Sequence, residues 1–105
     1  MADSPRLEQI RALLREDPDD PFLMYGLAME HLSLEQPEAA AKSFGDLMQS
    51  KPDYVPTYLM LGQTLQRLGR ESDAANVLRK GAIVAKAAGN DHALSEIQGL
   101  LAIVE

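Results

Sequence analysis

FLMYGLAMEHLSLEQPEAAAKSFGDLMQSKP, residues Phe22–Pro52, and YLMLGQTLQRLGRESDAANVL, residues Tyr58–Leu78, carry the same kinds of residue in the same order. In each stretch the large apolar residues follow one another at intervals of three or four. The two sets are Phe22, Tyr25, Met29 and Leu32, and Tyr58, Leu61, Leu65 and Leu68. Such spacing places the residues on one face of an α-helix, whereas a strand needs alternation. Helices are therefore predicted in both stretches.

The similarity extends to a spacing of 34 residues that separates Ile10, Phe44 and Leu78. The same shift aligns Pro18 with Pro52. A fixed period of roughly 20–50 residues is typical of arrays in which each unit buries its apolar face against its neighbours. The sequence therefore predicts stacked pairs of helices.

Prolines and capping residues indicate where these helices begin. Prolines in first turns lose no hydrogen bond, and Asp, Asn and Ser side chains accept one from the first free N–H groups. On this basis the expected N-caps are Ser4, Asp20, Asp53 and Asp91. Gly89 is expected to end the fifth helix. The predicted helices cover residues 5–16, 21–33, 37–50, 54–68, 71–88 and 91–104.

This pattern resembles the tetratricopeptide repeat family. Its first helix carries an aromatic residue, then Leu-Gly and Tyr, and its second carries Ala, Phe and a later Pro. The matching residues are Phe22, Tyr25, Gly26, Met29, Ala40, Phe44 and Pro52 in one unit, and Tyr58, Leu61, Gly62, Leu65, Ala74 and Leu78 in the next. The resemblance implies an all-α fold, a right-handed α-solenoid of antiparallel helix pairs with about six helices.

The expected organisation is a single domain over residues 1–105. It divides into an N-terminal half-repeat at 5–18, a first repeat at 19–52, a second at 53–88 and a C-terminal capping helix at 90–105. Gly26 and Gly62 are expected where a neighbouring helix approaches closely, with Ala40 and Ala74 as the facing small residues. A larger side chain at such a contact typically costs about 1–3 kcal/mol.

Composition excludes several classes of function. A formal net charge of −6 opposes binding to nucleic acid, whose affinity depends on clustered Lys and Arg. With no cysteine, the chain has no disulfide or thiolate site. No apolar run approaches the roughly 20 residues that span a bilayer, and Met1–Pro5 contains neither a basic leader nor an apolar signal core. No membrane partner and a cytoplasmic location are expected.

No arrangement of residues indicates catalysis, so no enzymatic activity, metal or cofactor is expected. His31 and Glu35 have a metal-compatible spacing but lack a third ligand. Residues 17–21 imitate a calcium loop without the glycine that such a loop requires, and they are better interpreted as a linker and an N-cap.

The resemblance implies a role in binding a peptide or an amphipathic helix of an unidentified partner protein in the concave groove. Its expected lining is Leu23, Leu27, Glu30, His31, Leu59, Gln63, Gln66 and Arg67. Relatives that grip C-terminal carboxylates carry Lys and Asn at positions held here by Leu23, Leu27 and Met60, so that clamp is absent. An apolar floor favours an amphipathic helix. In another interpretation, residues 91–104 fold back and fill this groove.

The last helix supports a second hypothesis, a homo-oligomerisation module. Its apolar residues form a stripe wider than one neighbouring helix covers. The expected self-association residues are Leu94, Ile97, Leu100, Leu101 and Val104. Under this hypothesis two copies pair through residues 94–104 as a homodimer.

Overall fold

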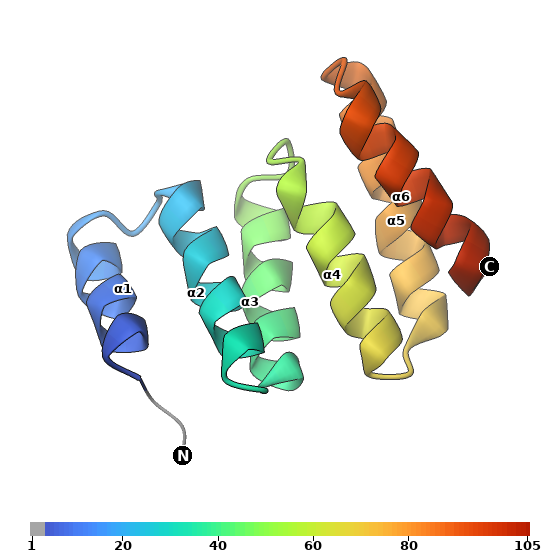
Figure 1. Ribbon diagram of the computed structural model, residues 1–105. Helices are drawn as coiled ribbons and strands as arrows, with labels where there is room; N and C mark the ends of the chain where they lie inside the picture. Colours follow the sequence, from blue (N-terminus) through green and yellow to red (C-terminus); the bar gives the residue numbers. More distant parts are fainter. Residues whose placement is uncertain (1–3) are drawn as a thin grey trace.

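Six α-helices form residues 4–105, the part of the chain that this computed structural model describes (Figure 1). They are α1 (Pro5–Glu16), α2 (Pro21–Ser33), α3 (Pro37–Ser50), α4 (Pro56–Arg67), α5 (Glu71–Ala87) and α6 (Asp91–Val104). These residues contain no strand, so the all-α prediction with six helices is confirmed. Residues 1–3, which belong to the segment examined for a signal leader, lie outside the described residues.

The helices follow one another as an antiparallel row, with α1 and α6 at opposite ends (Figure 1). Each packs against the next helix in the chain, and α6 also packs against α4. No helix in the described part is long and apolar enough to cross a membrane.

The helix starts confirm two of the four expected N-caps. The side chain of Ser4 accepts a hydrogen bond from the Leu7 N–H at 3.0 Å, and that of Asp20 accepts one from the Phe22 N–H at 2.9 Å. The other two predictions are wrong, as the start of α4 and the start of α6 show.

Helix α4 begins at Pro56 instead of residue 54, so Val55 occupies the N-cap position in place of Asp53. Two short-range bonds form a turn before the helix: the Tyr54 N–H donates to the Lys51 carbonyl, and the Tyr58 N–H donates to the Val55 carbonyl. At α6 the cap lies one residue before the expected Asp91. The Asn90 side chain accepts from the Ala93 N–H at 3.0 Å, and Asp91 is the first helical residue.

The tightest helix contact lies between α4 and α5. A Cβ atom at Gly81 would lie 2.4 Å from Tyr58 Cβ and 3.3 Å from Ile97 Cδ1, so three helices meet at this glycine. At Gly62 an added Cβ would lie 2.6 Å from Leu78 Cδ2. The expectation of a close approach is confirmed at Gly62, and Gly81 is a second such position that the sequence pattern did not single out.

The same expectation is wrong at Gly26. An added Cβ there would meet only Ile10 Cδ1, at 3.9 Å, which is an ordinary contact distance. Its helix α2 contacts α3 through another face, where the Tyr25 ring packs edge-on against Phe44, with centroids 5.7 Å apart. Helix α2 is therefore turned differently towards its partner than α4 is.

We predict that Gly81→Ala lowers the free energy of unfolding by about 1–3 kcal/mol, because the new methyl group overlaps the Tyr58 Cβ, which is fixed to the backbone. The matched control is Gly99→Ala in α6, where an added Cβ meets nothing within 4 Å. That change should stabilise the fold by up to about 1 kcal/mol through helix propensity. Chemical denaturation followed by circular dichroism measures both; equal effects would contradict the packing assigned to Gly81.

Candidate protein-binding groove

Equivalent faces of the two repeats lie in opposite environments. In α4, Tyr58 is 3% exposed and Leu65 is 8% exposed. Their counterparts in α2, Phe22 and Met29, are 72% and 36% exposed. The periodicity assigned all four to the buried face, and for Phe22 and Met29 this prediction is wrong. No helix covers this face of α2 in the way that α5 covers α4.

The exposed face of α2 forms one wall of a groove whose other wall is α1. The groove has a volume of about 940 Å³, compared with 390 Å³ for the hollow between α3 and α5. We call it the α1–α2 groove; it is lined by Ser4, Pro5, Arg6, Gln9, Ile10, Leu13, Phe22, Leu23, Gly26, Met29, Glu30 and Ser33. Most of its exposed lining is apolar, a composition typical of surfaces that bind other molecules.

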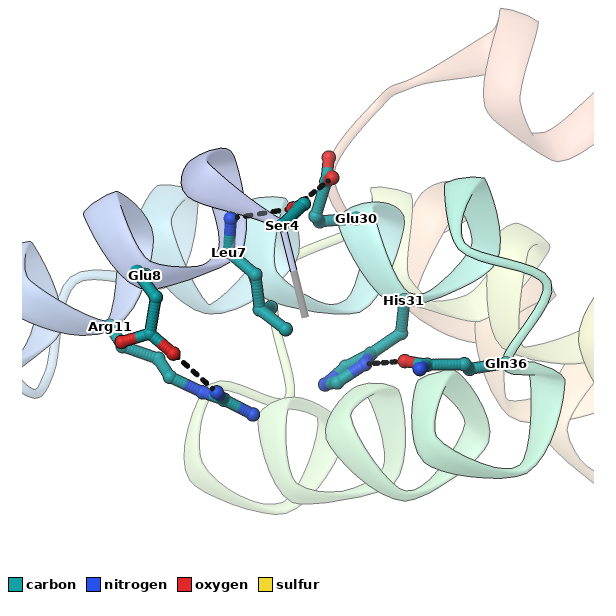
Figure 2. Close-up of polar contacts among 7 residues, drawn as sticks. All are labelled: Ser4, Leu7, Glu8, Arg11, Glu30, His31 and Gln36. Atoms are coloured by element: carbon teal, nitrogen blue, oxygen red, sulfur yellow. Dashed lines mark hydrogen bonds and ion pairs between the residues drawn. The ribbon is translucent and has the colours of Figure 1, made fainter. Parts of the chain in front are cut away.

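Polar contacts hold the two walls together near the start of α1 (Figure 2). The Ser4 hydroxyl donates to Glu30 Oε2 at 2.9 Å, and Arg6 Nε lies 3.6 Å from Glu30 Oε1. Leu7 is the residue of α1 that is fully buried. Helix α1 is thus attached at its first turn, while Ile10 and Leu13, further along, face the opening.

The eight residues predicted to line a concave groove lie in several separate places. Leu23 and Glu30 line the α1–α2 groove. Leu27 lines a smaller hollow of about 210 Å³ beside α3. Leu59 lines another of the same size, shared by α4 and α6. His31 is buried, and its Nδ1 lies 2.7 Å from Gln36 Oε1 (Figure 2).

The remaining three predicted residues lie on α4. Gln63 is exposed, Gln66 is half-buried, and Arg67 donates to Glu35 Oε1 at 2.6 Å. Glu35 ends the first helix pair with a φ of 59°, at the place where the second pair has Gly69 with a φ of 78°. The ion pair therefore connects α4 to the turn between α2 and α3, and it occupies the Arg67 side chain.

Sequence reasoning missed the apolar residues that make the α1–α2 groove: Ile10, Leu13, Phe22 and Met29. Their periodicity is the same whether a helix covers them or not, so it could not distinguish a core position from an open one. One signal was present. The half-repeat at 5–18 brings one helix instead of a pair, so the first full repeat has one neighbour fewer on that side.

Helix α6 contributes most of the stripe predicted for self-association to the core of its own chain. Ile97 and Val104 are buried, so their assignment as contact residues for a second copy is wrong in this fold. Leu94, Leu100 and Leu101 are partly buried and pack against the same core. The exposed large apolar residue of α6 is Ile103.

The tyrosines near the helix joints serve as packing residues. Burial, and secondarily the neighbouring Tyr54, raises the pKa of Tyr25 above its ordinary value. Burial, and secondarily Asp53, raises the pKa of Tyr58, whose hydroxyl donates to the Pro52 carbonyl at 2.6 Å. Both phenols are therefore neutral near pH 7. Within residues 4–105, no three His, Asp or Glu side chains group closely enough to hold a metal ion.

Comparison with known proteins identifies the family. No protein-family model matches the chain, and no curated protein matches it. Among solved structures, a tetratricopeptide repeat domain protein from Salinibacter ruber, solved by NMR, is 40% identical over 84% of this chain and 89% of that one, with a TM-score of 0.79. The chain belongs to the tetratricopeptide repeat family.

A crystal structure of a tetratricopeptide repeat domain protein from the same organism agrees, with 39% identity over 81% of this chain and 96% of that one, and a TM-score of 0.78. PcrH, solved in complex with the chaperone binding region of PopD, is 18% identical over 93% of this chain and 74% of its own, with a TM-score of 0.86. At that identity the likeness to PcrH concerns the tetratricopeptide repeat fold alone.

We predict that Phe22→Glu changes the free energy of unfolding of this tetratricopeptide repeat protein by less than about 0.5 kcal/mol, because the ring is exposed. Tyr58→Glu, the same change at the equivalent position of the second repeat, should cost about 3 kcal/mol or more, because it buries a charge and removes the ring from the core. Thermal and urea unfolding measure both. If Phe22→Glu proved as damaging as Tyr58→Glu, the α2 face would be covered in solution.

Proposed function

We propose that this protein is a non-catalytic interaction module that binds a helical segment of a partner protein in the α1–α2 groove. The observation that carries the proposal is the exposure of the Phe22 and Met29 face, since its counterpart in the second repeat is buried under α5. Exposed contiguous apolar surface is costly in water unless another molecule covers it. A protein segment is the occupant that suits a long apolar groove with a polar rim.

The concave lining predicted from the sequence contributes in part to this proposal. Leu23 and Glu30 belong to both surfaces, whereas Leu59 and Arg67 lie on α4, away from the groove. PcrH, which shares the fold, was solved with a segment of another protein, so this architecture is compatible with such a role. A binding role without catalysis is also typical of tetratricopeptide repeat proteins.

The proposal predicts that Phe22→Glu/Met29→Glu lowers the affinity for a native partner roughly tenfold or more, because both side chains would lie at the centre of the contact. Affinity capture from the native cell identifies partners held by the wild-type chain, and titration with each purified partner measures the change. The matched control is Ile83→Glu/Ile103→Glu, two equally exposed apolar residues on α5 and α6. Unchanged affinity of the groove variant for every partner would refute the proposal.

A second candidate function, self-association through α6, is favoured by the exposure of Ile103. Because Ile97 and Val104 are buried, this surface is narrower than the sequence suggested. If two copies pair here, the weight-average mass in sedimentation equilibrium should rise with protein concentration, and Ile103→Glu should restore the monomer mass. A monomer mass at all concentrations up to the millimolar range would exclude it.

A further inference from the structure

The second repeat provides a template for what fits the α1–α2 groove. In α4, the space above Gly62 is filled by Leu78 of α5, whose Cδ2 lies 2.6 Å from the position of an added Cβ. In α2, the space above Gly26 holds no such side chain, and Ile10 Cδ1 at 3.9 Å is the nearest atom. A leucine on an incoming helix therefore has a place to insert at Gly26.

The template also gives a direction. Helix α5 follows α4 after a turn of three residues, 68–70, so the two helices are antiparallel. A helix that docks on α2 in the same way runs antiparallel to α2. Its first turn then lies near Arg6 and Glu30, and its last turn lies near the connection between α1 and α2, beyond Leu13 and Phe22.

The charges at the two ends of the α1–α2 groove agree with that direction. Four carboxylates gather at the connection, and Arg15 is the only Lys or Arg between residues 12 and 41; the carboxylates are Glu16, Asp17, Asp19 and Asp20. At the other end, the Arg6 side chain is 77% exposed. A helix has a partial positive charge at its N-terminus and a negative one at its C-terminus, and natural helices place acids and bases accordingly. Basic residues at the end of the incoming helix would thus meet the carboxylates.

Resting on the proposed function, we infer that the α1–α2 groove selects an amphipathic helix that runs antiparallel to α2, inserts a leucine at Gly26 and carries Lys or Arg in its C-terminal half. The incoming helix places its acidic first turn beside Arg6. The acidic connection at residues 16–20 excludes the reverse orientation of such a helix, because like charges would then meet at that end.

A peptide with the sequence of α5, residues 71–87, is a suitable probe. It has the required spacing of small and large residues, Ala74, Leu78 and Gly81, and acids in its first turn. Its bases, Arg79, Lys80 and Lys86, lie in the second half. An isolated helix of this length is marginal in water, so a hydrocarbon staple should join positions 83 and 87, which are exposed in α5.

The comparison peptide exchanges charges between the two halves through Glu71→Lys, Asp73→Lys, Arg79→Glu and Lys86→Glu, which keeps the net charge. Fluorescence anisotropy of dye-labelled peptides is measured against the wild-type chain, the groove variant Phe22→Glu/Met29→Glu and the variant Asp17→Asn/Asp19→Asn. Asp20 is left unchanged because it caps α2.

We expect the α5 peptide to bind the wild-type chain about fivefold or more tightly than the comparison peptide, with binding lost in the groove variant. The preference should shrink towards equality in Asp17→Asn/Asp19→Asn and at about 1 M salt, where charges are screened. Equal affinities of the two peptides, both lost in the groove variant, would overturn the inferred direction while supporting the proposed function. If neither peptide binds, the inference fails; the proposed function fails with it only if the groove variant also keeps every native partner.

Discussion

The rest of the structure depends on the close approach of α4 and α5 at Gly62 and Gly81. At Gly81 the absence of a side chain lets Tyr58 and Ile97 reach the same point, so one glycine fixes the positions of three helices. Tyr58 is attached there by its Cβ, which cannot move without moving the backbone of α4. Helix α6 therefore takes its register from the same contact that holds α4 to α5.

Helix α2 is held by a different kind of joint. The Tyr25 ring packs edge-on against both Phe44 and Tyr54, with centroids 5.7 and 5.9 Å apart. Rings of this size fill the space between α2, α3 and the chain before α4, and no close backbone approach is needed. Because the aromatic face of α2 points into this joint, the face that carries Phe22 and Gly26 turns away from α3. The α1–α2 groove is thus a consequence of how α2 is anchored.

Most of the fold could be predicted from the sequence because it follows from local chemistry. Proline, glycine and short polar residues determine where a helix begins and ends, and apolar spacing determines that it is a helix. The differences at Asp53 and Asp91 are one or two residues, since several side chains near a helix start can satisfy the same N–H groups. Such choices depend on the turn geometry of neighbouring residues.

The candidate site was harder to predict because it depends on which helix covers which face. Phe22 and Tyr58 have the same neighbours in sequence and opposite exposures. The family pattern located a binding face on α2, and Leu23 and Glu30 were placed correctly within the groove lining. It could not show that Gly26 lacks the packing of Gly62, since that difference lies in the rotation of a whole helix.

The attachment of α1 connects the stability of the fold to the proposed binding. Helix α1 contributes Leu7 to the buried residues and is joined to α2 by the contacts of Ser4 and Arg6 with Glu30. Helices at the end of a repeat array have one neighbour and therefore unfold locally at a lower free energy than internal helices. A segment that fills the α1–α2 groove would cover Ile10 and Leu13 and give α1 a second neighbour. Binding in the groove and ordering of α1 are consequently linked: whatever free energy the partner adds by contacting α1 also opposes the local unfolding of that helix.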